Sequence, residues 1–444
     1  MRSWKDAARR DPAGFYRLPV DGAEVRLFLT ESLLSDLEED LGPQIANTRR
    51  FPGVLDVAVT PDAHHGYGVP VGCVIATSGT LAMGPVGYDI GCGVAALRSG
   101  VPRDRATPDT VREFSRRVMA RVGLGKGASG TPVSMARFQE IVRGGAEALG
   151  TGRGRAERDR IPVDDGWDVP RDSRAWRGQN QLGSLGGGNH FIELQHDGQW
   201  LWVMYHTGSR GFGHGLATHY FEKAREELSL KRGEMDLGYF TPESRHWRSY
   251  RNAVAAGGNY AIANRLLIGR EVAGAFAEVF DSEAELFYEI SHNLVQEERH
   301  PDLFGRPVWV HRKGATRALP GGHPMLAGTP WQDTGHPVLI PGSMGDSSYV
   351  LRPLPGAARC LYSVNHGCGR RKSRTAARRE ITPDQAERRL RELGVMVNAG
   401  GRVPVDESPE CYKPAEEVIR AVVEAGLAEV QVRLQPIASI KGMD

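Results

Sequence analysis

Apolar residues recur at intervals of three and four along several segments, which is the pattern of a helix with one buried face. Leucines at this spacing follow Thr30, a good helix cap, and end at Gly42. A second helix is expected from Thr107-Pro108 to about Val122, because proline suits the first helical position. The run 250–280 is rich in alanine, but its internal glycines at 257, 258 and 269 should weaken or bend a helix there.

Two further helices are expected near the C-terminus. The segment Thr382-Pro383-Asp384-Gln385 is a capping box with proline at the first helical position, and Gly394 ends that helix. The segment 414–425 predicts a last helix before Gly426, and 427–434 is expected to be extended.

Short β-branched runs at 54–59, 72–77, 200–205 and 307–310 predict strands. Most glycine-rich motifs fall at or just after such runs, where loops can carry chemistry on a rigid scaffold. No internal repeat and no clear linker divides the chain, and the Arg- and Asp-rich stretch Gly150–Asn180 looks like a polar loop insertion. The pattern therefore predicts mixed α and β structure without a clean domain break.

The net charge is only +2, but the basic residues are unevenly distributed. Arginines concentrate in 152–178, and arginine and lysine concentrate again in 370–379. Local basic patches on a nearly neutral protein suit a polyanion bound at one face. Solvated arginine-rich loops explain the first cluster equally well when it is taken alone.

The number of cysteines and the N-terminal sequence indicate in which cellular compartment the protein is expected. The chain has five cysteines, and no apolar stretch follows its first residues. No segment approaches the length of a membrane span. These features predict a reduced, cytoplasmic protein without a disulfide framework and without a membrane contact.

Asp89 and Cys92 lie three residues apart in a glycine-rich run, so a carboxylate and a thiolate can face one ion. His190, His206 and His292 stand in similarly unusual settings, beside asparagine, glycine or small polar residues. A thiolate can bridge two metals, and this set of ligands is large enough for a two-metal centre. Cys92 alone would be interpreted as a small core residue, and the histidines favour metal.

Several segments are suited to binding phosphate. Gly186–Gly188 precede Asn189 and would let backbone N–H groups approach an anion. The segments 312–317 and 341–345 supply cations, hydroxyls and exposed amides. None matches a Walker A motif, and no strand-linked GxGxxG indicates a dinucleotide fold, so a nucleotide would be held in another way.

Asp62, His64 and His65 form another candidate group. The two histidines are possible metal ligands, whereas Asp62 and His65 could instead support ligands from behind.

His366 lies beside Gly367 and is followed by Arg370 and Arg374. An accessible imidazole next to fixed positive charge could attack phosphorus and carry a covalent phosphoramidate. A turn histidine in front of a basic helix explains this segment equally well when it is taken alone.

Taken together, these segments resemble the RtcB-type RNA ligases from about Pro61 to Gly442. The resemblance rests on separate signatures in order along the chain, namely Pro61–His64, Gly87–Gly93, Gly188–Phe191, His206–Gly211, His292-Asn293, Arg312–Ala315, Pro341–Gly345 and His366–Arg370. It departs from the family at Cys368, where the motif after the nucleophile has a small alanine.

The resemblance implies roles for individual residues. Asp89, Cys92 and His190 would hold one Mn²⁺, and Cys92, His206 and His292 the other. His366 would be the nucleophile that takes GMP from GTP. Tyr412 would stack on the guanine and Glu193 would bind its N–H edge, within a set of nucleotide contacts consisting of Asn189, Glu193, Ser343, Ser348, Tyr412 and Lys441. Phosphates or RNA ends would be bound by Lys313, Arg370 and Arg374.

The implied fold is one compact α+β domain over residues 1–444, with a β-rich central cleft, surrounding helices and Gly150–Asn180 as a basic insertion. The implied activity is a GTP- and Mn²⁺-dependent ligase that joins RNA 3′-phosphate or 2′,3′-cyclic phosphate ends to 5′-hydroxyl ends. It proceeds through histidine-GMP and an RNA end activated as 3′-pp-G. An archease-type activator is a possible partner, and a monomer is expected.

Two other functions would use parts of the same sequence. A metal-dependent phosphoesterase that opens cyclic phosphates needs the metal ligands but not His366 or Lys441. A non-catalytic RNA-binding protein needs only the basic patches, and the few aromatics are not interleaved with them as base-stacking platforms would be.

Overall fold

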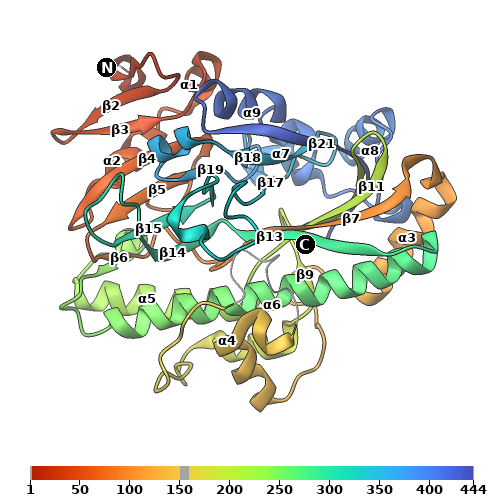
Figure 1. Cartoon of the computed structure of the whole chain (residues 1–444), viewed down its shortest axis with the longest axis horizontal. Coiled ribbons are helices and arrows are strands. Elements are labelled where there is room, and N and C mark those ends of the chain that lie inside the picture. The colour runs from red at the N-terminus through yellow and green to blue at the C-terminus, as the bar shows by residue number, and fades with distance from the viewer. Residues whose placement is uncertain (1–2, 151–159, 444) are drawn as a thin grey trace.

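Two large β-sheets form the centre of the fold, and helices pack against them (Figure 1). The computed structural model describes residues 3–150 and 160–443. The first sheet has the order β1 (Arg9–Arg10), β2 (Tyr16–Val20), β3 (Ala23–Leu27), β4 (Val54–His64), β5 (Val71–Thr77), β15 (Val308–Lys313) and β14 (Asn293–Glu298).

The second sheet carries most of the candidate site. Its order is β13 (Ala284–Ser291), β7 (Gly93–Pro102), β11 (Trp200–Thr207), β10 (Phe191–His196), β21 (Ala428–Ile440), β18 (Ser348–Pro353) and β17 (Val338–Ile340), with β20 (Met396–Val397) also paired to β21. Smaller pairs are β12 (Tyr239–Phe240) with β6 (Leu81–Ala82), β16 (Ala315–Arg317) with β19 (Ser363–Asn365), and β8 (Gly123–Leu124) with β9 (Ser184–Gly186).

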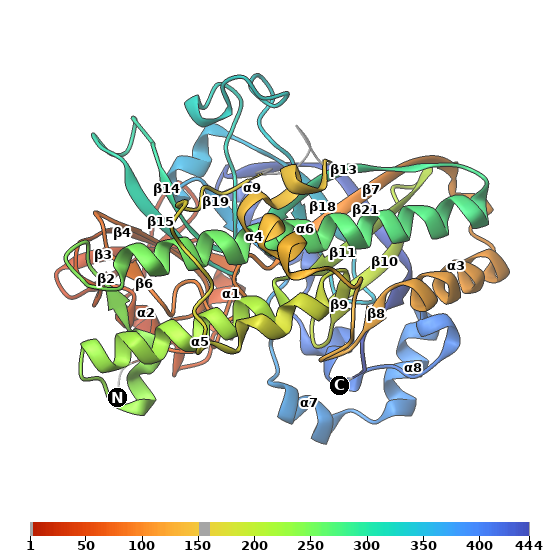
Figure 2. The same cartoon turned by 90° about the horizontal axis from the view of Figure 1, so that it is seen from below.

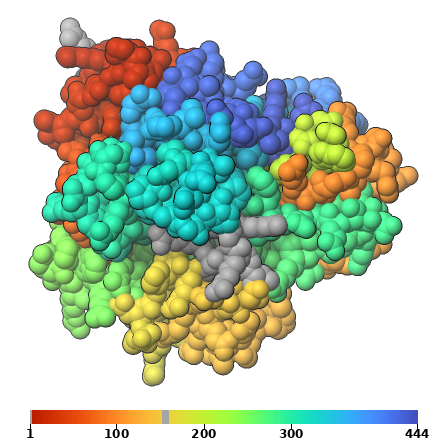
Figure 3. All heavy atoms as spheres, in the orientation of Figure 1, coloured from red at the N-terminus to blue at the C-terminus, as the bar shows by residue number. Residues whose placement is uncertain are grey.

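The α-helices lie at both sides of the sheets and along the lower edge of the molecule (Figures 1 and 2). They are α1 (Glu31–Asp36), α2 (Leu41–Asn47), α3 (Pro108–Arg121), α4 (Met135–Leu149), α5 (Arg210–Glu227), α6 (Trp247–Phe280), α7 (Arg374–Glu380), α8 (Pro383–Glu392) and α9 (Ala415–Glu424). The large sheets are mainly antiparallel, so the expected α+β class is confirmed. Segments around residues 300–340 form the middle of one face (Figure 3).

Local sequence signals account for several of these elements. Thr107, Ser134 and Thr382 each accept a backbone hydrogen bond at the start of α3, α4 and α8, as expected of cap residues. The strands predicted at 54–59, 72–77 and 200–205 fall within β4, β5 and β11, and the one predicted at 307–310 starts one residue before β15. The last predicted helix is α9, and the extended segment after it belongs to β21.

The predicted helix from Thr30 to Gly42 is wrong in its extent. The chain leaves the helical conformation at Leu37, α2 starts at Leu41, and Gly42 lies inside α2. A Cβ at Gly42 would come within 2.5 Å of the Trp4 ring. This glycine therefore permits a close contact and does not end a helix.

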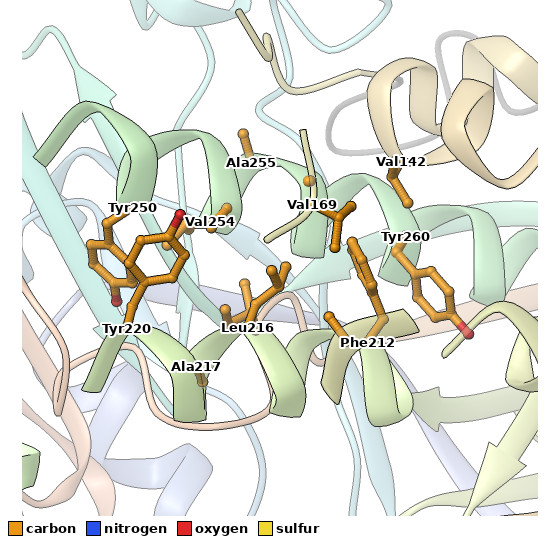
Figure 4. Close-up of a cluster of buried hydrophobic side chains, with 14 of the residues drawn as sticks. Val142, Val169, Phe212, Leu216, Ala217, Tyr220, Tyr250, Val254, Ala255 and Tyr260 are labelled. Atoms are coloured by element: carbon orange, nitrogen blue, oxygen red, sulfur yellow. The ribbon is translucent and has the colours of Figure 1, made fainter. Parts of the chain in front are cut away.

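The glycines of α6 do not interrupt it, contrary to the expectation that they would weaken or bend it. The segment from Trp247 to Phe280 is one continuous helix, largely buried, and the rings of its Tyr250 and Tyr260 pack against α5 (Figure 4). A Cβ at Gly257 would lie 2.8 Å from Ile90, and one at Gly269 would lie 2.4 Å from the Tyr205 hydroxyl. Tertiary packing therefore requires glycine here despite its poor helix propensity.

The structure bears on the expectations about disulfides, membrane-spanning segments and the insertion Gly150–Asn180. The five cysteines are buried and free of disulfides, and none of the described helices is long and apolar enough to cross a membrane. Of the predicted insertion Gly150–Asn180, residues 151–159 lie outside the described residues, and Arg174–Gln181 at its end form a 3₁₀ turn.

The contact between α3 and α6 can be tested by truncation. Phe114 is fully buried and packs edge-on against Phe276 at 6.1 Å between ring centroids. Phe114→Ala should lower the free energy of unfolding by about 3–5 kcal/mol, because a cavity remains. Met119 on the same helix is 37% exposed, so Met119→Ala should cost about 0.5 kcal/mol. Denaturant titration compares them, and equal losses would contradict this packing.

Candidate metal and nucleotide site

Neighbouring strand ends bring the predicted metal-binding residues together. The first residue of β7 lies opposite the last residues of β11 and β13. Cys92 precedes β7, His206 lies near the end of β11, and His292 follows β13. His190 precedes β10, which pairs with β11 beside His206, and Asp89 lies in the turn before Cys92. Antiparallel register thus gathers residues that are up to about two hundred positions apart.

The ligand atoms of these residues face one another. Cys92 Sγ lies 3.1 Å from His206 Nε2 and 3.5 Å from His190 Nε2. His206 Nε2 lies 3.2 Å from His292 Nε2, and His190 Nε2 lies 3.2 Å from an Asp89 carboxylate oxygen. Among the described residues, Cys92, His190 and His206 also form a buried group with the spacing of a metal site.

Hydrogen bonds behind the rings fix which nitrogen is free. His190 Nδ1 lies 2.8 Å from the Leu185 carbonyl, and His206 Nδ1 lies 3.2 Å from the Asn189 carbonyl. A carbonyl can only accept, so Nδ1 carries the proton and the Nε2 lone pair points inward. Burial also lowers the pKa of His206 and of His292 well below the usual value. Neutral imidazoles converging on a sulfur are a donor set that fits a divalent cation.

Asp89 is held in its orientation by the turn after β11. Ser209 donates a backbone hydrogen bond of 3.0 Å to Asp89 Oδ1. A Cβ at Gly208 would lie 2.3 Å from the same oxygen, so only glycine fits there. Burial acts to raise the pKa of Asp89, but the contact with His190 and the charge of Arg210 lower it below its usual value. The carboxylate is therefore ionised.

A buried arginine that the sequence did not single out joins the three strand ends. Arg265 of α6 is fully buried and donates to the Glu289 carboxylate at 2.6 Å. It also donates to the carbonyls of Gly91 at 2.7 Å and Thr207 at 3.2 Å, and to the Ser291 hydroxyl at 2.8 Å. No local pattern distinguishes it from the surface arginines, because its partners lie in other segments.

His366 lies against the metal-binding cluster and is held by a buried carboxylate. Its Nδ1 lies 2.6 Å from Asp62 Oδ2, and its ring packs edge-on against His292 at 4.8 Å. The same Asp62 oxygen accepts from the backbone N–H groups of His366 at 3.0 Å and Gly367 at 3.2 Å, and Thr60 donates to the other oxygen. Although burial acts to raise it, the proximity of His366 lowers the pKa of Asp62. This arrangement leaves Nε2 of His366 as the free nitrogen.

Lys413 supports the end of β4, which carries Asp62. Its buried Nζ donates to the carbonyls on either side, at 2.6 Å to Ala63 and 3.3 Å to Pro61. Burial lowers the pKa of this lysine to about 8. Sequence reasoning missed Lys413, although it directly follows Tyr412.

A cavity beside His366 collects most of the predicted nucleotide and phosphate contacts. The predicted site residues that line it with His366 are Asn189, Glu193, His206, Ser343, Arg370, Arg374, Tyr412 and Lys441. Cys368, the departure from the family pattern, also lines it as a buried thiol whose pKa is raised by burial.

Two predicted residues do not line this cavity. Ser348 lies behind it, where its hydroxyl accepts from the backbone of Gly342 at 3.0 Å. Lys313 is buried and donates to the carbonyls of Tyr67 at 2.9 Å and Val69 at 3.1 Å. Its contacts in the structure are therefore with the 61–69 loop.

The two histidines beside Asp62, both predicted as possible metal ligands, differ in position. His64 lines the cavity, and its ring stacks on His366 at 6.4 Å. His65 is exposed and turned toward Asp40, 3.5 Å away, so it takes no part in the site.

Two acidic residues lie at the cavity. One is Glu193, and the other is Glu407, whose carboxylate is surrounded by hydrogen-bond donors and cations. Glu193 is 1% exposed and accepts from Gln195 at 2.8 Å, and burial raises its pKa to about 7. Glu407, another residue missed from sequence, accepts from the Tyr412 hydroxyl at 2.5 Å. Its remaining partners are cations, namely Arg370 at 3.1 Å, Lys441 at 3.3 Å and Arg374 at 3.5 Å.

A second hollow opens on the other side of Asp89, and we call it the basic groove. Its cations come from the loop after β8, the 3₁₀ turn Arg174–Gln181 and α5, and they are Lys126, Arg174, Arg177, Arg210 and Lys223. Asp172 and Glu222 also line it. Arg174 and Arg177 belong to the arginine cluster 152–178, which the sequence explains equally well as a polyanion-binding face or as solvated loops.

Known proteins share this sequence over nearly its whole length. The model of the family described as tRNA-splicing ligase RtcB matches residues 44–442. A tRNA-splicing ligase RtcB from Thermococcus kodakarensis is 36% identical over 96% of this chain and 95% of its own length. The protein of that name from Pyrobaculum aerophilum is 34% identical over 96% of each chain. An RNA-splicing ligase RtcB from Mycobacterium tuberculosis is 36% identical over 90% of this chain and 100% of its own length.

The ligand cluster predicts a cation-dependent gain in stability that requires Cys92. Mn²⁺ added to chelator-treated protein should raise the unfolding temperature, by a free energy of about 2.7 kcal/mol at one hundred times the dissociation constant. Cys92→Ser should lose most of this rise, because its sulfur faces both His190 and His206. Cys360→Ser, which alters a buried thiol outside the cluster, should keep it. Equal rises in both variants would contradict the site.

Proposed function

This chain belongs to the RtcB family of RNA ligases, and on that basis we propose that it seals RNA in a reaction that consumes GTP and requires Mn²⁺. The ends joined are an RNA 3′-phosphate, or a 2′,3′-cyclic phosphate opened by water, and a 5′-hydroxyl. The observation that carries the proposal is the position of His366, held by Asp62, between the metal-binding cluster and a cavity that ends in Glu193 and Tyr412.

We assign the metal-binding cluster to two Mn²⁺ ions with Cys92 shared. Asp89 and His190 complete one set of ligands, and His206 and His292 complete the other, which is consistent with the distances among their donor atoms. Bound there, the ions would polarise phosphoryl oxygens and offset the negative charge that builds up during transfer.

His366 acts as the nucleophile of the first stage. Its Nε2 attacks the α-phosphorus of GTP, a nitrogen–phosphorus bond forms, and the bond to the leaving pyrophosphate breaks. Asp62 beside Nδ1 stabilises the positive charge that develops on the ring. The resulting histidine-GMP stores an activated phosphoryl group next to the cluster.

The later stages transfer GMP and then release it. An oxygen of the RNA 3′-phosphate attacks the phosphorus of histidine-GMP, the bond to His366 breaks, and the RNA carries a diphosphate-linked guanosine. The 5′-hydroxyl then attacks the RNA phosphorus and loses its proton, and GMP departs. A free 3′-phosphate could not be joined directly, because attack would have to expel oxide or water.

The cavity is suited to a guanine nucleotide. Tyr412 stacks on the base, and Glu193 accepts from its N–H edge. Arg370 and Arg374 bind phosphate oxygens, and the other proposed contacts are Asn189, Ser343, Ser348 and Lys441. A phosphoesterase that only opened cyclic phosphates would need neither this cavity nor the Asp62–His366 pair.

The basic groove offers a place for the RNA strand that ends in the 5′-hydroxyl. In-line displacement requires the attacking and leaving oxygens on opposite sides of the phosphorus. The leaving GMP occupies the cavity on the His366 side of the cluster, and the basic groove opens on the Asp89 side. Its lysines and arginines can neutralise strand phosphates.

The covalent intermediate is the first test. Incubation with Mn²⁺ and α-labelled GTP should label the protein, and the label should survive a denaturing gel and be lost in acid. His366→Ala should remove the label. His65→Ala, which alters an exposed histidine turned toward Asp40, should be labelled like wild type. A folded His366→Ala variant that is labelled fully would overturn the nucleophile assignment.

Glu193 predicts how guanine binding depends on pH. Its pKa of about 7 means that the carboxyl is protonated below and ionised above that pH, and only the ionised form accepts both guanine N–H groups. GTP affinity without metal should therefore rise as the pH increases through 7 and then level off.

GTP also changes its protonation state with pH, and Glu193→Gln controls for this because the variant lacks the titrating carboxyl of the protein. It should bind GTP more weakly, by about tenfold for one lost charge-assisted hydrogen bond, and should lack the rise. Equilibrium titrations at several pH values compare the two proteins. An identical pH profile in both would exclude Glu193 as the group responsible.

A further inference from the structure

Tyr67 presents the most exposed large hydrophobic side chain of the described residues. It is 69% exposed, although it lies in the short loop between β4 and β5. The loop spans residues 65–70 and directly follows the end of β4, which carries Asp62. Single exposed apolar side chains are common on protein surfaces, so the significance of this ring depends on what lies around it.

The backbone that carries this ring is held rigidly on both sides. Gln44 of α2 donates to the Gly66 carbonyl and accepts from the Gly66 N–H, both at 2.9 Å. Asn47 of the same helix donates to the Gly68 carbonyl at 2.8 Å. Two side chains from one helix therefore fix the residues before and after Tyr67.

Lys313 also holds the backbone around Tyr67 in place. Its buried Nζ donates to the carbonyl of Tyr67 itself at 2.9 Å and to that of Val69 at 3.1 Å. Gly68 adopts a left-handed conformation with φ of +72°, and a Cβ there would lie 2.9 Å from Asp236. The exposed ring thus stands on a fixed backbone, and little backbone entropy remains to be lost when something binds it.

Neighbouring rings connect Tyr67 to the basic groove. The edge of Tyr67 meets Tyr88 at 6.3 Å between centroids, and Tyr88 stacks on His214 at 5.4 Å. Tyr88 and His214 both line the basic groove, and Tyr88 directly precedes Asp89. Tyr67 therefore adjoins the basic groove through Tyr88, and most of its side chain is exposed.

A free aromatic face beside a row of cations has the chemistry of a single-stranded nucleic-acid site. The cations bind the backbone phosphates and the ring stacks on an unpaired base. A protein partner explains the ring less well, because a groove with five lysines and arginines is poorly suited to an ordinary interface core.

We propose that Tyr67 is a stacking platform for one nucleobase of the RNA strand that supplies the 5′-hydroxyl. This inference rests on the proposed ligase function and on the assignment of that strand to the basic groove. Stacking needs a ring but no particular base, so the platform should accept any of the four bases and discriminate against an abasic nucleotide.

The first experiment measures binding and ligation with variants of Tyr67. Tyr67→Ala should weaken binding of a labelled 5′-hydroxyl RNA strand by about 5- to 150-fold and raise its KM in ligation. Tyr67→Phe and Tyr67→Trp should restore most of both. Labelling of the protein by α-labelled GTP should be unchanged in all three, because Tyr67 does not line the cavity beside His366. Tyr16→Ala, a partly exposed tyrosine of β2, is the matched control and should change nothing.

The second experiment identifies the base and the strand. Single abasic nucleotides are placed at successive positions of the 5′-hydroxyl strand and, separately, of the 3′-phosphate strand. At one position near the 5′-hydroxyl, wild type should lose as much affinity as Tyr67→Ala loses on intact RNA, and Tyr67→Ala should lose little more. Fully additive losses at every position would overturn the proposal, as would coupling confined to the 3′-phosphate strand.

Failure of the ligase function has a different signature. A wild type that binds RNA but forms no histidine-GMP would contradict the proposed function, and strand binding would still decide the role of Tyr67.

Discussion

The site depends on how one buried guanidinium joins three strand ends. Arg265 is neutralised by Glu289 and donates to the carbonyls of Gly91 and Thr207, which flank the segments carrying the predicted metal ligands. Removing either member of such a buried pair leaves an uncompensated charge, so the arrangement is strongly specified. The ligand atoms can face one another because the backbones behind them are fixed from α6.

Around this centre the molecule separates two kinds of chemistry. On one side lies the cavity with His366 and Glu193, whose lining includes several buried polar groups. On the other side lies the basic groove, whose arginines and lysines are spaced along an open surface. The two hollows each include one predicted metal ligand, His206 in the cavity and Asp89 in the basic groove. The arrangement favours group transfer between two substrates over simple hydrolysis.

Much of the site could be predicted because its reactive residues have unusual local sequence. Cys92 and His366 lie beside glycines in segments that, taken alone, also fit a core residue and a turn. Their chemistry is predicted from the whole set of motifs in order along the chain. Arg265, Lys413 and Glu407 could not be identified this way, since their partners lie in distant segments. Gly42 and the glycines of α6 misled for the same reason. These glycines allow close contacts with Trp4, Ile90 and Tyr205, and helix propensity takes no account of such contacts.

The adjacency of Tyr412 and Lys413 links two parts of the catalytic cycle. One residue turns its ring toward the cavity, and the next donates to the carbonyls that flank Asp62. A backbone displacement that widened the cavity would therefore pull on the support of His366. The shape of the cavity and the position of the His366 imidazole therefore depend on one short stretch of backbone, residues 412–413.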